Sequence, residues 1–165
     1  MELKKIFKII MIISLILIMI DQASKIFISN LIKDEVNIIP NGMLTITKVE
    51  NEGVAFGLNK QNLGNIGLCF IILIVIVNYI IAQKERMTKP VVVYLSFIIA
   101  GGISNLLDRI LKGAVFDFIK MGDFPVFNFA DMCIVCGWLL FVINFLKYTA
   151  IDIRAEIPVK KDKQK

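Results

Sequence analysis

Four apolar runs, at residues 6–28, 66–82, 91–111 and 127–148, set the strongest limit on how this chain of 165 residues can fold. A helix of roughly 20 apolar residues crosses a bilayer. Hydrophobic residues make up 57% of the chain, whereas an ordinary soluble domain has roughly 45–50%. The sequence therefore predicts an all-α polytopic membrane protein with four transmembrane helices.

The connections between these runs are short. Those at 29–65 and 112–126 are too small for an independent soluble domain, so we expect one membrane-embedded domain over residues 1–165. Within 29–65, residues 44–49 alternate apolar and polar side chains, which is typical of a half-exposed strand. We expect a second short strand at 54–58 and an interfacial helix over 31–37. Together they predict a small β element after the first helix.

The basic residues are distributed unequally along the chain. With four crossings, 12 of the 19 Lys and Arg residues lie on the side of the two termini, and five lie on the other side. Because basic residues are retained in the cytoplasm, this asymmetry predicts cytoplasmic termini and places 29–65 and 112–126 outside. The net charge of +5 is thus explained by topology, and we expect no nucleic-acid partner.

Polar residues interrupt the apolar pattern between residues 101 and 131. Gly101, Asn105 and Asp108 or Arg109 recur at spacings of three and four, so they share one face of a helix over 91–111. A charged side chain in a membrane span costs about 2.5–3.5 kcal/mol on insertion scales. Asp108 and Arg109 must therefore pair, lie near a helix end or face a wet cavity, and the region is a candidate functional site.

Two further groups of polar residues have simple structural explanations when taken alone. Asp21 and Lys25 are four residues apart and can pair on one helical face, which eases the insertion of both charges. Asn51 and Gly53 fit an ordinary turn. Either group can also belong to a site formed with distant parts of the chain.

The absence of histidine limits the available chemistry. It excludes Ser-His and Cys-His dyads and His-based zinc motifs. Cys133 and Cys136 form a C-x-x-C spacing within an apolar run, but no second pair of ligands accompanies them, so we expect apolar packing and no metal. Two aspartates such as Asp117 and Asp131 can share a proton and activate water without a cofactor. Asn128 and Arg109 can supply hydrogen-bond donors to a substrate backbone or oxyanion.

Five motifs occur in order along the chain: DQASK, NEGVAFG, GGISNLLDR, VFDFI and FPVFNFAD. Together they resemble the lipoprotein signal peptidases, the signal peptidase II family of bacterial intramembrane aspartic proteases. The resemblance implies that signal peptides of prolipoproteins are cleaved before a diacylglyceryl-modified cysteine, near the outer face of the cytoplasmic membrane. It implies catalytic roles for Asp117 and Asp131. It also implies that the following residues bind substrate or support the site: Asn51, Gly53, Asn105, Asp108, Arg109, Asn128, Asp21 and Lys25.

This chain departs from the family pattern at two positions. Ser104 stands where glycine is usual, and Met132 follows Asp131 where a small or hydroxyl residue is common. We expect these changes to affect helix packing and substrate preference, with the chemistry intact. The implied partners are lipid-modified prolipoproteins and membrane lipid, and we expect a monomer.

A proton-coupled small membrane transporter is the alternative, because buried carboxylates also form proton relays. A transporter would be expected to carry acidic residues near the bilayer midplane and an inverted internal repeat. The sequence has no such repeat, and Asp117 and Asp131 fall at the edges of spans.

Overall fold

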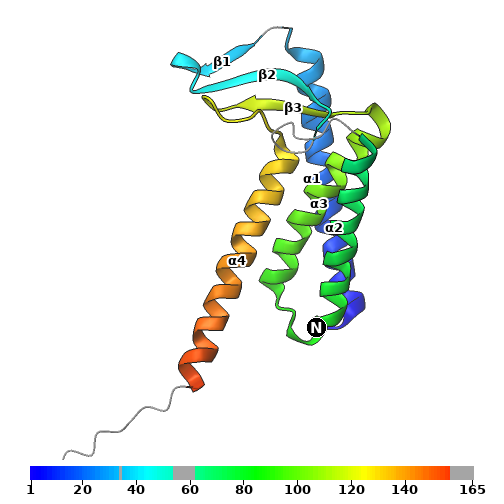
Figure 1. Ribbon diagram of the computed structural model, residues 1–165, viewed down its shortest axis with the longest axis vertical. Coiled ribbons are helices and arrows are strands. Elements are labelled where there is room, and N and C mark those ends of the chain that lie inside the picture. Colours follow the sequence, from blue (N-terminus) through cyan, green and yellow to red (C-terminus); the bar gives the residue numbers. More distant parts are fainter. Residues whose placement is uncertain (34, 54–61, 157–165) are drawn as a thin grey trace, which may run out of the picture.

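The computed structural model describes residues 1–33, 35–53 and 62–156. This part of the chain contains helices α1 (Leu3–Leu31), α2 (Asn62–Ala82), α3 (Lys89–Lys112) and α4 (Phe129–Glu156). It also contains strands β1 (Val36–Ile39), β2 (Leu44–Asn51) and β3 (Val115–Lys120), with short 3-10 turns η1 (Pro40–Gly42) and η3 (Lys84–Arg86). The helices run along the long axis of the molecule, and the small sheet lies across one end of them (Figure 1).

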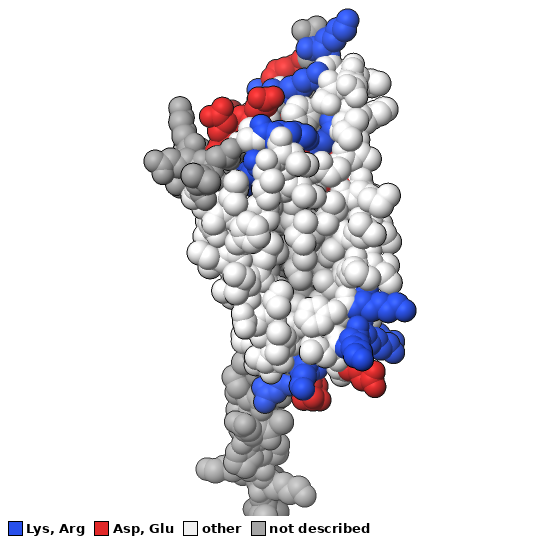
Figure 2. All heavy atoms as spheres, turned by 90° about the vertical axis from the view of Figure 1, so that its right-hand side faces the viewer, with Lys and Arg blue, Asp and Glu red and all other residues white. Residues whose placement is uncertain are grey.

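The surface of the helices fits a bilayer. Among the described residues, α3 and the segment Phe129–Lys147 of α4 are long and apolar enough to cross a membrane. Large apolar side chains are exposed on the helices, including Met11, Leu15, Ile74, Val75 and Leu139. Figure 2 shows the charged residues gathered at the two ends of the molecule, with a belt between them that is almost free of charge. Such a belt is what a helical membrane protein presents to lipid.

Each of the four predicted apolar runs forms a helix. Helices α1 and α3 extend beyond both predicted limits, and α2 begins four residues early but ends at Ala82 as predicted. Helix α4 begins at Phe129, two residues after the predicted start at 127, and continues to Glu156. The end of α3 is fixed by Gly113, which has a φ of 82° and donates its N–H to the carbonyl oxygen of Arg109 at 3.1 Å. This left-handed cap turns the chain directly into β3.

The sheet corrects part of the prediction for the outer connections. The strand predicted at 44–49 is part of β2, which pairs antiparallel with both β1 and β3. The interfacial helix predicted over 31–37 is wrong, because Val36 begins β1 and pairs with Ile46 of β2. The strand predicted at 54–58 lies outside the described residues. The third strand comes from the distant connection 112–126.

Polarity changes along the bundle. The apolar core lies at the end away from the sheet and includes Ile6 and Ile10 of α1, Ile80 of α2, and Val92 and Leu95 of α3. Nearer the sheet, the buried residues become polar, and they include Asp21, Lys25, Asn105, Asp108, Asp117 and Asn128. Burying polar groups is unfavourable unless they find partners, so this end of the molecule must be held by a hydrogen-bond network.

Gly101 allows α3 and α4 to approach each other beside this network. A Cβ atom at this position would collide with the carbonyl oxygen of Ala130 and lie 2.6 Å from Cγ1 of Ile134. We expect Gly101→Ala to destabilise the protein by roughly 1–3 kcal/mol, as overpacking does. Gly102→Ala is the matched control, because its Cβ would meet only Leu73, at 3.9 Å. Equal thermal unfolding midpoints for the two variants in detergent would contradict this account of the packing.

Candidate active site

Asp117 is brought beside Asn128 by a tight closure of the chain. The N–H groups of Phe118 and Ile119 both donate to the carbonyl oxygen of Phe127, and the N–H of Phe127 donates back to Ile119. Residue 128 therefore returns to β3, and its Nδ2 donates to Oδ1 of Asp117 at 2.6 Å. The Asp117 side chain is buried.

Asp131 is placed by the start of α4. Oδ1 of Asn128 accepts the N–H of Asp131 at 3.0 Å, and Oδ2 of Asp131 accepts the N–H of Asn128 at 3.1 Å. This reciprocal pair is a capping box, with asparagine and aspartate in place of the usual serine and glutamate. The carboxylate also lies at the positive end of the helix dipole. The sequence Asn-x-x-Asp thus fixes both the helix start and the orientation of Asp131.

Asn128 connects the two carboxylates. Its side chain donates to Asp117 and accepts the backbone N–H of Asp131. The side chain is completely buried. Burial raises the pKa of Asp117 to about 6; the hydrogen bond from Asn51 opposes this rise, and the negative charge of Asp131 adds to it. The proximity of Asp131 therefore makes it easier for Asp117 to keep a proton.

This raised pKa predicts that stability falls as pH rises. The pKa of Asp117 is about 6 in the folded protein, against a reference value of 3.8. Because the folded-state value is the higher one, the favourable contribution is complete below pH 3.8 and is lost as pH rises through about 6. The expected loss is about 3 kcal/mol. Thermal unfolding in detergent between pH 4 and 7 should show a steeper decline for the wild type than for Asp117→Asn, and parallel curves would contradict the prediction.

A second buried cluster lies between α1 and α3. Nζ of Lys25 makes ion-pair contacts of 2.7 Å with Oδ2 of Asp21 and with Oδ2 of Asp108. Each of these three side chains is 1% exposed, so almost no water screens their charges. Nζ of the half-exposed Lys112 lies 2.9 Å from Oδ1 of Asp108 and balances the second negative charge. Asp21 also accepts the N–H of Ala130 at 2.8 Å, which links the cluster to the start of α4.

Asn105 joins this cluster to the aspartate pair. Its Oδ1 accepts hydrogen bonds from Nζ of Lys25 and from Nδ2 of Asn128, both at 3.1 Å. Its Nδ2 donates to Oδ1 of Asp131 at 2.7 Å. The lysine on α1 therefore fixes the orientation of the Asn105 amide, and the amide holds Asp131.

The end of β2 is held by Arg109. Nη2 of Arg109 donates to the carbonyl oxygen of Gly53 at 3.0 Å, and Nη1 donates to the carbonyl oxygen of Asn105 at 3.4 Å. The N–H of Gly53 donates to Oδ1 of Asn51 at 3.0 Å. Nδ2 of Asn51 is then free to donate to Oδ2 of Asp117 at 2.9 Å. Both oxygens of Asp117 thus accept a hydrogen bond from an asparagine amide.

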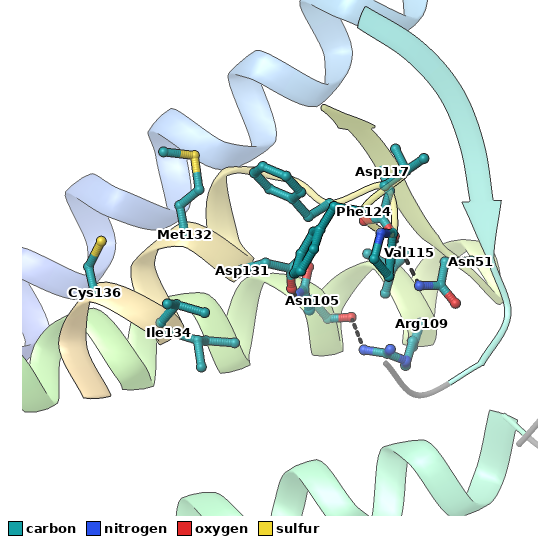
Figure 3. Close-up of a pocket in the computed structure, with 14 residues that line it drawn as sticks. Asn51, Asn105, Arg109, Val115, Asp117, Phe124, Asp131, Met132, Ile134 and Cys136 are labelled. Carbon is teal, nitrogen blue, oxygen red and sulfur yellow. Dashed lines mark hydrogen bonds between the residues drawn. The ribbon is translucent and has the colours of Figure 1, made fainter. Parts of the chain in front are cut away.

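The two aspartates open onto a cavity of about 620 Å³. In Figure 3, Asp117, Asn51, Asn105 and Arg109 lie toward one end, and Met132, Ile134 and Cys136 line the cavity along α4. Phe124 and its neighbours form the wall beside Asp117 and Asp131, and the lining includes Pro125, Val126 and Phe127. The cavity has a polar end with two carboxylates and a long apolar wall. This lining suits a bound molecule that is polar at its reacting bond and apolar elsewhere.

The cysteines do not form a cluster of metal ligands. Cys133 is buried, Cys136 is exposed toward the cavity, and Cys69 is half-buried on α2. Among the described residues, no group of three or more Cys, Asp or Glu side chains is arranged to hold a metal ion.

All ten residues singled out from the sequence lie in these two linked clusters. The sequence did not identify three other members: Gln22, Ser104 and Lys112. Oγ of Ser104 donates to Oδ2 of Asp21 at 2.7 Å, and Nε2 of Gln22 donates to Ser104 Oγ at 3.0 Å. For Ser104 the sequence predicted an effect on helix packing and substrate preference, and it did not indicate these hydrogen bonds. The spacing of four between Asp108 and Lys112 was a signal for their ion pair.

Comparisons with known proteins show the family of this chain. A model of the signal peptidase (SPase) II family matches residues 13–147. The lipoprotein signal peptidase of Syntrophomonas wolfei is 38% identical over 135 residues, which cover 80% of this chain and 89% of that protein. The lipoprotein signal peptidase of Staphylococcus aureus strain JH9 is 31% identical over 151 residues, which cover 88% and 92% of the two chains.

Two solved structures share the fold of this chain. A solved structure, described as a bacterial membrane enzyme determined by the in meso method at 2.3 Å resolution, superimposes with a TM-score of 0.78 at 32% identity. The match covers 96% of this chain and 94% of that chain. A second bacterial membrane enzyme structure, at 1.9 Å resolution, gives a TM-score of 0.74, also at 32% identity, and covers 85% of this chain and 94% of that chain. The chain therefore belongs to the signal peptidase II family.

Proposed function

We propose that this protein is an aspartic endopeptidase that removes signal peptides from prolipoproteins, with Asp117 and Asp131 as its catalytic pair. The observation that carries the proposal is the link through Asn128, which donates to Asp117 and caps Asp131 at the polar end of the cavity. Membership of the signal peptidase II family supports a peptidase and does not favour the proton-coupled transporter.

The two aspartates would act in different protonation states. Asp117, whose pKa is raised to about 6, holds the shared proton. Asp131 accepts hydrogen bonds from Asn105 and from the backbone of Asn128, and these donors hold its carboxyl group in place. Asp131 then takes a proton from water as the water oxygen attacks the scissile carbonyl carbon, and Asp117 gives its proton to the substrate. Asp131 then gives the proton that it took from water to the leaving nitrogen, the C–N bond breaks, and Asp117 regains its proton from the hydroxyl of the collapsing diol. Every proton is thus carried by the two carboxyl groups, so the reaction needs neither metal nor cofactor.

The shape of the cavity supports a lipid-modified substrate. Its α4 wall carries Met132, Ile134, Val135 and Cys136, which present apolar surface a short way from the carboxylates. We infer that the cleaved bond precedes a diacylglyceryl-modified cysteine. Arg109 and Asn51 would hold the substrate or the β2 end, as their contacts with Gly53 and Asp117 allow.

The proposed topology has all four helices crossing the bacterial cytoplasmic membrane and both termini in the cytoplasm. The 12 basic residues on the side of the termini support this orientation. The sheet and the aspartate pair would then lie near the outer face, where exported prolipoproteins arrive. Residues 1–165 would act as one domain and as a monomer.

The function is tested with purified protein in detergent and a diacylglyceryl-modified prolipoprotein. We expect mass spectrometry to show a product that begins at the modified cysteine, at a rate that a chelator leaves unchanged. The matched substrate carries serine in place of that cysteine, so that it cannot be modified, and should remain largely intact. Equal cleavage of the two substrates, or cleavage elsewhere, would contradict the proposal.

A further inference from the structure

The β1–β2 hairpin contains a stretch without charge. Residues 36–47 include no Asp, Glu, Lys or Arg, although Glu35 and Lys48 stand directly on either side. We call residues 36–47 the hairpin segment. Its side chains Ile38, Ile39 and Met43 are 56%, 41% and 65% exposed. Neighbouring exposed apolar residues without intervening charge are typical of an interaction surface.

The hairpin segment is held at the end of the helix bundle. Nζ of Lys48 donates to the carbonyl oxygen of Ser29, in the last turn of α1, at 2.6 Å. Apolar side chains remain exposed up to that turn, including Phe27 and Leu31. The hairpin turn projects sideways beyond the upper end of α4 (Figure 1). It therefore overhangs the space that lipid fills around membrane-spanning helices.

We propose that the hairpin segment inserts its exposed apolar side chains into the outer interface of the bilayer. The proposal rests on the membrane placement given above and not on the peptidase chemistry. The partner of the hairpin segment is the region of the bilayer where phospholipid headgroups meet acyl chains. The exposed Lys33 and Lys48 lie beside the segment and suit anionic headgroups.

The backbone of β1 explains why the segment lies in the interface and not in the hydrocarbon core. β1 pairs with β2 on one side and forms the edge of the three-stranded sheet. Among the described residues no strand pairs with its other edge, and the N–H and C=O groups there require water or headgroups as partners. Apolar side chains can enter the acyl region from that position while the backbone stays hydrated.

Insertion of the hairpin would also set the height of Asp117. β2 continues from the hairpin segment to Val49, which pairs with Asp117 of β3. A fixed depth of the hairpin therefore fixes the depth of the carboxylate relative to a substrate held in the same membrane.

Tryptophan fluorescence tests the insertion. Trp138 is the one tryptophan in the chain, so Trp138→Phe gives a background to which Ile38→Trp, Met43→Trp or Glu50→Trp is added singly. Glu50→Trp is the matched control, because Glu50 is exposed on β2, the second strand of the hairpin, but lies beyond the hairpin segment. Each variant is reconstituted in phosphatidylcholine–phosphatidylglycerol vesicles, with or without brominated acyl chains.

We expect the tryptophans at 38 and 43 to emit at shorter wavelength than the tryptophan at 50 and to lose much more intensity with brominated lipid. Equal emission and equal quenching at all three positions would overturn the proposal. A blue shift that appears only at high protein-to-lipid ratio, without quenching by bromine, would show a second copy covering the hairpin and would also overturn it. These readouts do not depend on catalysis, so failure here leaves the proposed function standing.

Discussion

Asp117→Asn and Asp131→Asn are each expected to lower the turnover number for a lipidated prolipoprotein by roughly 10²–10⁴-fold, the usual contribution of general acid–base catalysis. Asparagine keeps the size of aspartate but can neither take a proton from water nor hold the shared proton. Each replacement also turns one NH₂ group toward a donor, such as Asn51 or Asn105, and we expect a modest loss of stability from that contact. Steady-state cleavage rates measure the effect.

The control for these variants is Asp123→Asn. Asp123 is an exposed aspartate on the same connection, between β3 and α4. The Asp123→Asn variant should cleave at close to the wild-type rate. All three variants should still bind substrate, as measured by crosslinking or fluorescence anisotropy. Substantial cleavage by well-folded Asp117→Asn, together with loss in Asp108→Asn, would transfer the catalytic role to the second cluster.

Lys25→Met is expected to have the largest effect on stability. The ammonium group lies 2.7 Å from carboxylate oxygens of both Asp21 and Asp108, and its removal leaves two buried carboxylates without their shared partner. Breaking a buried ion pair from one side costs roughly 3–5 kcal/mol. Activity should fall as well, because Lys25 also orients the amide of Asn105 that holds Asp131.

Lys112→Met is the matched control for Lys25→Met, because it removes an equal charge from an exposed position. Lys112 contacts the same Asp108, but its side chain is 49% exposed, so its loss should cost at most about 1 kcal/mol. Thermal unfolding midpoints and the yield of folded protein in detergent compare the two variants. If Lys25→Met is as stable as Lys112→Met, the second cluster does not hold the site together.

The helices were predictable from sequence and part of the sheet was not. Each apolar run forms a helix because its length and composition leave few other structures in a membrane. β3 was missed because Val115–Lys120 is short and lies between two glycine turns, Gly113 and Gly122. Its partner β2 is distant in the chain, and no local pattern indicates a pairing over such a separation.

The site shows the same division between local and distant information. The Asp21–Lys25 ion pair has a helical spacing of four and was predicted. Motif resemblance pointed to Asn105 and Asn128, yet their roles depend on contacts between α3 and α4 that no spacing reveals. Ser104 shows the limit most clearly, because its hydrogen bond to Asp21 joins residues 83 positions apart.

The central claim is that Asp117 and Asp131 work as one unit, and the double variant Asp117→Asn/Asp131→Asn tests it most directly. Residues that act together in one chemical step are strongly non-additive. We predict that the turnover number of the double variant, measured on the same lipidated prolipoprotein, is scarcely lower than that of either single variant. A turnover number lowered by the product of the two single effects would contradict the claim.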